Sequence, residues 1–493
     1  MRVFNDAFEF GHDRNFPMKS IFDPVRMGAV SLDLMPSGRA SAELMALRQR
    51  TRLTQLLEAA RRGSALYRER LQGLSLVTTE LGDLPVVCKH ELMARFDDWV
   101  TDPQLKLATL RDFTVNPTCI GEPYLGKYLV WESSGTCHEP GIYVQDAQAL
   151  AVYDALESVR RCAPRPLLRL FDPFLLGERI AFVGATSGHF ASMVTMQRLR
   201  QINPFMAQRL RCFAIEQSTR DLVAELNRYA PTVIATYPTV AGLLADEFSR
   251  GALRFRPQEI WTGGETLTPA ERLRVEQTLG CAVRNSYGAS EFMSIGWECS
   301  HQQMHLNSDW VLLEPVDELG QPVPAGEASY TTLLTNLANY VQPLIRYDMG
   351  DQITVSPNRC RCGCALPVIE VQGRRDDALQ MQGRDGLLVT LLPLALTTAL
   401  EDEAGVFDFQ ICQRDAHTLV LRLNMQADEG ARAMQRCRAV LADFAALHDL
   451  APLEVIEELG LAIPRGRSGK AQRVMAQPCA ERRDAADGFQ AAA

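Results

Sequence analysis

The sequence has no long apolar run and no excess of basic residues. Its longest apolar stretch, Leu387 to Leu400, is shorter than the roughly 20 residues that span a bilayer and contains Pro393. The first residues, MRVFNDAFEFGHD, have no apolar core of signal-peptide type. The formal net charge of −9 speaks against a nucleic-acid binder, whose surface would be basic. We therefore expect a cytoplasmic protein without membrane or nucleic-acid partners.

The chain is long and contains many cysteines. Its 493 residues are enough for two or three domains, and an apolar content of 46% is ordinary for a globular protein. Thirteen cysteines without a secretory signal are typical of thiols or metal ligands rather than of a disulfide framework. The composition leaves the oligomeric state open, with a dimer as one alternative.

Strands and helices alternate through the middle of the sequence. Short apolar or β-branched runs at Arg179 to Gly184, Thr232 to Tyr237, Glu259 to Trp261 and Ala282 to Ser286 predict strands. Helical patterns cover Ala147 to Arg161, Thr219 to Tyr229, Val240 to Arg250 and Pro269 to Leu279, the last begun by Thr268 and a first-turn proline. This alternation predicts a parallel sheet with crossover helices. Beyond His305, alternating apolar and polar residues with intervening turns predict an antiparallel β subdomain.

The chain divides into four segments. Residues 1–83 are expected to be an N-terminal extension, irregular over its first forty residues, followed by an amphipathic helix from Ser41 to Gly63. Residues 84–373 form the expected α/β core with its β subdomain. Residues 374–477 are expected to form a small α+β domain, and residues 478–493 a disordered tail.

Several segments carry residues suited to chemistry. Asn285 to Glu291 (NSYGASE) follows a predicted strand and places an aromatic ring, a hydroxyl and a carboxylate on one turn. Ser133, Ser134, Gly135 and Thr136 form a hydroxyl-rich turn that can hold a phosphate chain, or an ordinary Ser/Thr turn. RYDMGD (346–351), GRRDD (373–377) and PRGRSGK (464–470) follow downstream.

In this order the motifs resemble the adenylate-forming superfamily of acyl-CoA synthetases and ligases, and most of all its phenylacetate–CoA ligase and coenzyme F390 synthetase branch. The resemblance covers roughly residues 85 to 475. It implies an α/β fold with a large N-terminal adenylate-forming domain and a small, mobile α+β C-terminal domain.

The resemblance implies a role for each motif. Tyr287 stacks near the adenine, Glu291 holds Mg²⁺, Asp351 accepts the ribose hydroxyls, Asp376 is the hinge and Lys470 is catalytic. The other nucleotide-binding positions are Ser133, Ser134, Gly135, Thr136, Gly263, Gly264, Glu265, Ser286, Gly288, Ser290 and Arg374. Glu291 and Arg374 are also counted as catalytic. The Gly263 to Glu265 turn can equally be a plain β-to-α turn, and Arg374 and Asp376 can be solvated charges.

One segment departs from the family pattern. Where a typical member continues its phosphate loop with Thr or Ser, Gly, Lys and Pro, this sequence has Cys137, His138, Glu139 and Pro140. An anion therefore stands where a cation usually approaches the β and γ phosphates.

A second constellation is independent of the nucleotide. Cys299, His305, Cys360 and Cys362 can supply the four N and S ligands that Zn²⁺ prefers, with His301 and Cys364 as alternatives. Inert thiols are the other interpretation.

The resemblance implies ATP-dependent conversion of a carboxylic acid to an acyl-AMP, followed by transfer to a thiol. The thiol is expected to be that of coenzyme A or of a carrier protein, and the acid an aryl or flat one bound near Tyr237, Pro238, Gly263 and Gly288. A nucleotidyl transferase of the F390 synthetase type and a non-catalytic nucleotide-binding relative remain as alternatives.

Overall fold

A computed structural model describes residues 21–76, 78–133, 140–160, 177–215, 217–374, 377–391, 393–464 and 472–476. The predicted site residues that lie outside this described part are Ser134, Gly135, Thr136, Asp376 and Lys470, together with Cys137, His138 and Glu139. The expected tail from residue 478 also lies outside it. None of the helices in the described ranges is both long and apolar enough to cross a membrane.

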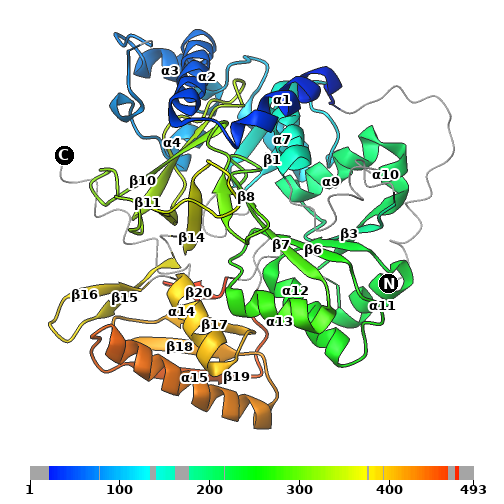
Figure 1. The fold of residues 1–493 in the computed structure, drawn as a ribbon, viewed down its shortest axis with the longest axis vertical. Coiled ribbons are helices and arrows are strands. Elements are labelled where there is room, and N and C mark those ends of the chain that lie inside the picture. The colour runs from blue at the N-terminus through cyan, green and yellow to red at the C-terminus, as the bar shows by residue number, and fades with distance from the viewer. Residues whose placement is uncertain are drawn as a thin grey trace.

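A nine-stranded mixed sheet forms the centre of the molecule (Figure 1). Five of its strands are parallel to their neighbours in the order β7-β6-β5-β3-β4, and β8, β9, β14 and β13 extend it with antiparallel pairs. The strands are β3 Ile180–Gly184, β4 Leu210–Ala214, β5 Val233–Thr236, β6 Glu259–Gly263, β7 Ala282–Tyr287, β8 Gly296–Glu298, β9 Met304–Leu306, β13 Asp351–Val355 and β14 Val368–Arg374. The predicted parallel sheet is confirmed.

Helices cover both faces of the parallel strands. In Figure 1, α11 to α13 lie below these strands, whereas α7, α9 and α10 lie above. The helices are α7 Ala147–Arg160, α9 Ala191–Ile202, α10 Pro204–Arg209, α11 Thr219–Tyr229, α12 Pro238–Ser249 and α13 Pro269–Leu279. Thr268 caps α13 by accepting the Glu271 N–H, as its sequence predicts. The lower helices and the sheet share one apolar core that includes Leu226, Leu244 and Ile260.

Two smaller antiparallel sheets flank the central one. Strands β10 Val311–Val316, β11 Thr331–Asn336 and β12 Tyr347–Asp348 form one, which confirms the antiparallel pairing expected after His305. Strands β1 Leu129–Glu132 and β2 Ile142–Gln145 form a hairpin whose residues are all buried. Short helices precede this hairpin: α3 Ala65–Arg70, α4 Lys89–Ala94, α5 Phe96–Trp99 and α6 Leu107–Val115, with 3₁₀ turns at Leu81–Asp83 and Pro117–Cys119.

The expectation that the first forty residues are irregular is wrong for Pro24–Ser37. These residues form helix α1, which begins with an Asp23 cap and a first-turn proline. Its residues Val30 and Leu34 are buried, and the helix packs along α7. Gly28 and Pro36 weaken the helical pattern in the sequence. The packing that stabilises α1 is with a helix more than a hundred residues away, so no local signal reveals it. Helix α2, Ala42–Gly63, lies where its pattern predicts.

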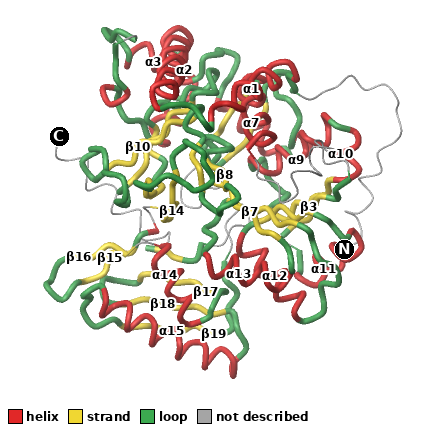
Figure 2. The backbone as a smooth tube through the Cα atoms, in the orientation of Figure 1, coloured by secondary structure: helices red, strands yellow, loops and turns green. Residues whose placement is uncertain are grey.

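Residues 377–476 build a separate small core. Strands β19 Glu454–Leu459, β18 Thr418–Leu423, β17 Phe409–Gln413 and β20 Val474–Met475 form a four-stranded sheet, and β15 Leu379–Gln382 pairs with β16 Leu388–Leu391. Helix α14 Pro393–Ala399, a π-helical turn Leu400–Ala404 and helix α15 Ala427–Leu447 complete it. Figure 2 shows this part as a compact unit below the central sheet.

The two parts meet beside α13. The buried carboxylate of Glu401 accepts hydrogen bonds from the Thr268 hydroxyl and the Arg473 guanidinium. Arg473 also donates to the carbonyl oxygen of Thr266, at 3.3 Å. The contact therefore falls on the turn that follows β6.

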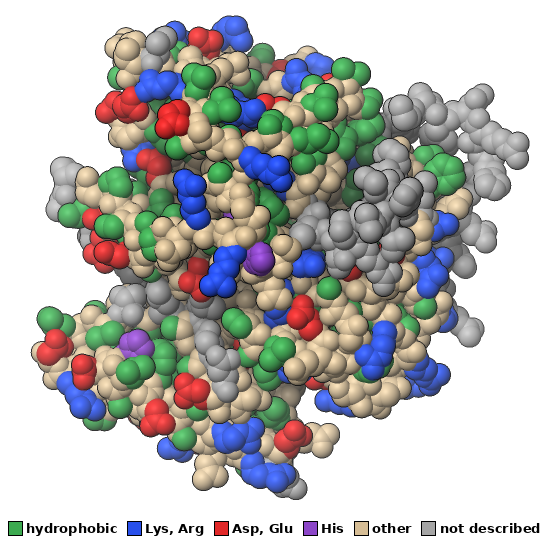
Figure 3. All heavy atoms as spheres, viewed as in Figure 1, with side chains coloured by type: hydrophobic (Ala, Val, Ile, Leu, Met, Phe, Trp, Pro, Cys, Tyr) green, Lys and Arg blue, Asp and Glu red, His purple; other side chains and the backbone are tan. Residues whose placement is uncertain are grey.

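On the face drawn in Figure 3, acidic and basic side chains are interspersed rather than gathered by sign.

Candidate active site

The parallel strands bring three turns to one edge of the sheet. Gly263 at the end of β6 pairs with Ser286 on β7, and the Ser286 hydroxyl donates to the Thr262 carbonyl oxygen at 3.1 Å. The carboxylate of Glu265 accepts the backbone N–H of Thr239 at 3.1 Å, which ties the turn after β6 to the first turn of α12. The carboxyl edge of a parallel sheet is where such folds bind ligands.

The turn after β7 leaves no room for a side chain at Gly288. A Cβ atom there would lie 2.1 Å from the carbonyl oxygen of Met293. The backbone of Ser290 accepts the indole N–H of Trp131 at 2.8 Å, so the turn is fixed to strand β1. Glycine is therefore required where the segment 285–291 folds back on itself.

Tyr287 and Asp351 form the first polar cluster of the site. The Tyr287 hydroxyl donates to Asp351 Oδ2 at 2.6 Å, and Arg374, the cross-strand partner of Asp351, lies 3.1 Å from Oδ1. Burial, and then the Asp351 charge, raise the pKa of Tyr287 well above its usual value. The phenol therefore stays protonated and donates. The side chain of Arg374, at the end of β14, remains 54% exposed.

Glu291 lies at the junction of three sheets. Its Oε1 atom accepts hydrogen bonds from Tyr143 on β2, at 2.5 Å, and from Tyr347 on β12, at 2.9 Å. The amide of Asn336 donates to the Glu291 carbonyl oxygen at 2.9 Å. Burial first, and the Glu291 charge second, raise the pKa of both tyrosines well above the usual value. Within the described residues no hydrogen bond reaches Oε2, so this oxygen can accept a cation.

The hairpin β1–β2 carries the predicted phosphate loop. Ser133 closes its base, because its N–H donates to the Gly141 carbonyl oxygen and its hydroxyl accepts the Gly141 N–H, both at 2.9 Å. Tyr143, two residues past Gly141, reaches Glu291. The base of the loop therefore lies beside the carboxylate.

Three site residues escaped sequence analysis. Tyr143 and Tyr347 lie in short strands, where a tyrosine usually indicates core packing. Tyr347 belongs to the RYDMGD motif, of which only Asp351 was assigned a role, whereas no local signal distinguishes Tyr143. The third is Lys89, the first residue of α4. Burial lowers the pKa of Lys89, while the charge of Glu291 opposes that shift. The signal that could have found it is the missing cation of the 137–139 loop.

The backbone places Lys89 at the site. Val87 bridges to Tyr347: its N–H donates to Arg346 O at 3.1 Å, and its carbonyl accepts the Asp348 N–H at 2.9 Å. Lys89 follows two residues later. After burial, which lowers the pKa of Lys89, the charge of Glu291 raises this pKa and that of Arg374 lowers it.

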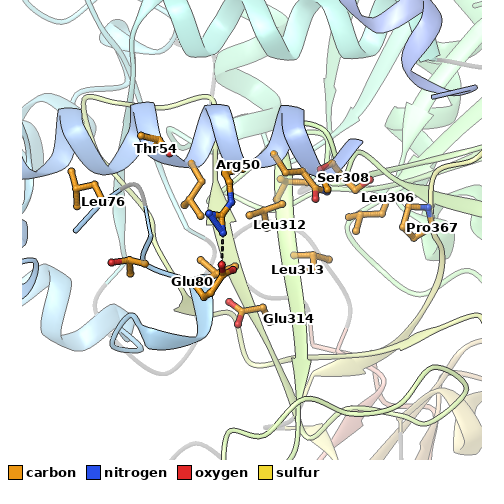
Figure 4. Close-up of a pocket in the computed structure, with 16 residues that line it drawn as sticks. Arg50, Thr54, Leu76, Glu80, Leu306, Ser308, Leu312, Leu313, Glu314 and Pro367 are labelled. Atoms are coloured by element: carbon orange, nitrogen blue, oxygen red, sulfur yellow. Dashed lines mark hydrogen bonds and ion pairs between the residues drawn. The ribbon is translucent and has the colours of Figure 1, made fainter. Parts of the chain in front are cut away.

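The expected substrate-pocket residues lie on neighbouring elements. Gly263 ends β6 and Gly288 directly follows β7, whereas Tyr237 and Pro238 are buried at the start of α12. Elsewhere, a groove of about 550 Å³ runs between α2 and β10, with the Arg50–Glu80 ion pair across it (Figure 4). This groove contains none of the predicted site residues.

The predicted zinc ligands come together. The donor atoms of Cys299, His305, Cys360 and Cys362 all lie within 4.8 Å of one another. The Cys299 and Cys360 sulfurs are 3.6 Å apart, close to the roughly 3.7 Å edge of a tetrahedron with 2.3 Å Zn–S bonds. The Nδ1 atom of His305 lies 3.0 Å from the Leu366 carbonyl oxygen, which directs Nε2 toward the cysteines. His301 contributes a backbone N–H to this set, at 3.4 Å from the Cys299 sulfur.

Comparison with known proteins supports the adenylate-forming fold. No protein-family model matches the chain. The chain is 28% identical over 267 residues to a phenylacetate–coenzyme A ligase of Thermus thermophilus, covering 52% of this chain and 56% of the relative. It is 28% identical over 191 residues to the phenylacetate–coenzyme A ligase of Pseudomonas putida, covering 36% and 42%. The chain thus spans about half the length of the curated relatives it matches.

The structural likeness extends over nearly the whole chain. A 2-hydroxyisobutyryl-CoA ligase in its postadenylation state, in complex with 2-HIB-AMP, has a TM-score of 0.65 and 20% identity and covers 97% of both chains. The same ligase in its thioesterification state has a TM-score of 0.53 and 20% identity, covering 95% of this chain and 96% of that one. The fold expected from the sequence is therefore confirmed, including its small C-terminal part.

The buried tyrosines predict a loss of stability at high pH. In the unfolded chain these tyrosines ionise at about pH 10, whereas in the folded state the pKa values of Tyr143 and Tyr347 are raised well above this value. The unfolded state therefore releases these protons first, and folding stability falls as the pH rises above about 10. Urea denaturation between pH 8 and 11 should show a smaller loss in Tyr143→Phe/Tyr347→Phe than in wild type.

The exposed Tyr330 provides the control for this measurement. Tyr330→Phe should follow the wild-type pH profile. Equal losses in wild type and in the double variant would show that the two phenols do not carry the effect.

Proposed function

We propose that the chain is an AMP-forming ligase that activates a carboxylic acid with ATP and transfers the acyl group to coenzyme A. The observation that carries this proposal is the convergence of Tyr287, Asp351 and Glu291 on the carboxyl edge of the sheet. The partial sequence similarity to phenylacetate–coenzyme A ligases supports it.

The reaction has two balanced steps. In the first, a substrate carboxylate oxygen attacks the α phosphorus of ATP, the bond to the bridging oxygen breaks, and pyrophosphate leaves. In the second, the thiol of coenzyme A attacks the acyl carbon, the thiol proton passes to solvent, and AMP leaves with the electron pair of the broken C–O bond. Adenylation thus converts a poor leaving oxygen into a good one.

We assign the nucleotide to the polar clusters at the sheet edge. The Asp351 carboxylate accepts hydrogen bonds and donates none, which suits two ribose hydroxyls. Tyr287 offers its ring to the adenine beside the Gly263 and Gly264 turn, and Ser133 and Ser290 flank the phosphates. Arg374 at the end of β14 contacts the ribose and phosphate from the edge of the small part.

Glu291 is suited to hold Mg²⁺. Both tyrosines donate to Oε1, and the described residues leave Oε2 to coordinate a cation. Magnesium needs only one or two carboxylates beside substrate phosphates and water. When bound, the ion neutralises charge on the phosphates.

Lys89 supplies the cation that the altered phosphate loop lacks. A lysine ammonium is a compact point charge, and a partly desolvated one interacts strongly with phosphate. The backbone bonds of Val87 to Arg346 and Asp348 fix the segment that carries it. The sequence places Glu139 where relatives carry the loop lysine, so the positive charge comes from a different segment.

We propose that residues 374–477 act as the mobile domain and that Asp376 is its hinge. In this arrangement Arg473, three residues after Lys470 in the sequence, contacts Thr266 beside the Gly263 to Glu265 turn. That contact favours a role for Lys470 in the first step, where it stabilises charge on the α phosphate. Rotation about the hinge then opens the thiol channel for the second step.

The four-donor set is proposed to hold a structural Zn²⁺. It joins the β8–β9 hairpin, through Cys299 and His305, to the loop between β13 and β14, through Cys360 and Cys362.

The ATP and coenzyme A used by the reaction are consistent with a cytoplasmic enzyme. Carrier-protein phosphopantetheine offers the same thiol chemistry, and direct comparison of the two thiols distinguishes them.

The ligase proposal predicts acid-dependent pyrophosphate release. Wild type should release pyrophosphate with ATP, Mg²⁺ and an accepted acid, and form a thioester with coenzyme A. Lys470→Ala should lower pyrophosphate release on the order of a hundredfold, while thioester formation from supplied acyl-AMP survives. A stable adenylylated product would indicate a nucleotidyl transferase instead. ATP binding without release with any acid would indicate a non-catalytic relative.

Removal of the Lys89 charge should weaken use of ATP without weakening the fold. Lys89→Met should raise the KM for ATP at least tenfold, whereas Lys89→Arg should retain most activity. The melting temperature should not fall, because burial of this charge is costly in the folded state. Lys106→Met, at an exposed ion pair, is the matched control. An unchanged KM in Lys89→Met would exclude the assignment.

The metal proposal predicts one zinc per chain. Cys360→Ser should reduce the zinc content and the melting temperature together, because binding of a structural zinc contributes directly to folding. Cys412→Ser, at a thiol outside the set, should change neither. Purified protein without zinc and with a melting temperature indifferent to chelators would contradict a zinc site.

A further inference from the structure

A small cavity lies beside helix α7, and Ser286 of the segment 285–291 is among the residues that line it. It has a volume of about 40 Å³ and lies between α7 and strands β6, β7 and β8. Trp261 pairs with Arg284 and Ser286 pairs with Trp297 in the sheet register, and all four line the cavity. Alternation along β7 therefore directs Arg284 and Ser286 to the same face as the two tryptophans.

Two residues that line this cavity each have a buried donor without an acceptor. Within the described residues, neither Nε of Arg284 nor the indole Nε1 of Trp297 has a hydrogen-bond partner. A buried donor left unpaired costs about 1–3 kcal/mol, so native proteins rarely retain two at one place. Unpaired donors on two residues that line the same cavity point to an acceptor that binds there.

The other polar groups around the cavity are already paired. Glu298 accepts hydrogen bonds from the Arg272 guanidinium and from the Asn285 N–H. Glu157 accepts the Ser294 hydroxyl. The Glu157 carboxylate disfavours a second anion here and favours a group that can also donate a proton.

A hydroxyl group meets these requirements. It has two acceptor lone pairs, which match the Arg284 and Trp297 donors, and one O–H, which can donate to Glu157. It is neutral, so it avoids the cost of a buried charge. The cavity is large enough for a group of this size, since a water molecule needs roughly 10–15 Å³ of such space.

The strand geometry sets how far the hydroxyl lies from the reacting carboxyl. Arg284 and Ser286 are two residues apart, which is about 7 Å along an extended strand. Ser286 lies at the rim, directly before Tyr287 of the nucleotide cluster. An acid that places its carboxyl at the rim would reach the unpaired donors with a group about 7 Å away.

We propose that the cavity binds the distal hydroxyl of the acid substrate, so that the enzyme selects hydroxy acids whose hydroxyl lies far from the carboxyl. The proposal rests on the proposed ligase function and specifies its substrate class. A site that donates hydrogen bonds to a substrate hydroxyl discriminates strongly against the analogue without it, because its own buried groups then stay unpaired.

Matched acids test this selection. Pyrophosphate release should be measured with 4-hydroxybenzoate against benzoate, and with 4-hydroxyphenylacetate against phenylacetate. The kcat/KM should be at least tenfold higher for each hydroxy acid. The positional control, 2-hydroxybenzoate, should show no such advantage, because its hydroxyl lies beside the carboxyl.

Two variants test the donors separately. Arg284→Met and Trp297→Phe should each reduce the advantage of the 4-hydroxy acids at least fivefold, while the kcat/KM for the parent acids stays within twofold. Trp310→Phe is the matched control, because among the described residues Trp310 Nε1 is also buried without a hydrogen-bond partner, and Trp310 does not line the cavity. The melting temperature should not fall in either test variant, whereas a purely structural role would lower it.

The outcomes separate this inference from the proposed function. Equal turnover of hydroxylated and parent acids, unchanged in both variants, would overturn the inference and leave the ligase intact; water would then satisfy the donors. If no acid releases pyrophosphate, calorimetric titration of each acid in the presence of AMP tests whether the cavity binds a hydroxy acid. Binding of the 4-hydroxy acids but not of the parent acids, lost in Arg284→Met, would support the cavity proposal without the ligase function. Absence of any acid binding would overturn both.

Discussion

The carboxylate of Glu291 is the interaction on which the candidate site depends. One oxygen of this group accepts hydrogen bonds from Tyr143, in the β1–β2 hairpin, and from Tyr347, in the three-stranded sheet. Glu291 itself follows β7 of the nine-stranded sheet. Three sheets that share no backbone ladder are thus joined at one side chain. Because Oε1 is used for this purpose, the position of Oε2 relative to the phosphate-loop hairpin is fixed before any ligand binds.

The sequence predicted the elements whose causes are local. Thr268 and Pro269 predict the start of α13 from within a single turn. The cysteines and the histidine predicted the four-donor set, because thiol and imidazole groups are metal ligands wherever they lie in the chain. The helical pattern of α1 was weaker, since Gly28 and Pro36 interrupt it and its stability comes from packing on α7. Local signals are insufficient wherever the stabilising contact is distant in the chain.

The site residues missed in the sequence show the same limitation. Tyr143 and Tyr347 differ from ordinary core tyrosines only in facing Glu291, more than fifty residues away from either of them. Nothing near Arg284 or Trp297 in the sequence indicates that both residues line one cavity and that each has an N–H without a partner among the described residues. The motifs predict the residues that contact the nucleotide, whereas the proposed selection of the acid rests on the register between neighbouring strands, which no motif encodes.

That register also couples the four-donor set to the cavity. The ring of His305 stacks on Trp297, with centroids 5.2 Å apart and planes inclined by 25°. Trp297 on β8 is the register partner of His305 on the adjacent β9, so both side chains lie on the same face of this hairpin. A metal that orders the hairpin would therefore also fix the position of the Trp297 indole beside the cavity.

The segment 346–351 then explains how a lysine from outside the central sheet enters the site. Arg346 donates to the carbonyl oxygens of Gly82 and Leu84, at 2.9 and 2.6 Å, and its backbone pairs with Val87. One short motif therefore holds the chain that carries Lys89, and through Tyr347 and Asp351 it also holds the two polar clusters. The proposed role of Lys89 therefore rests on a segment that this motif holds in place, although that segment precedes every strand of the central sheet.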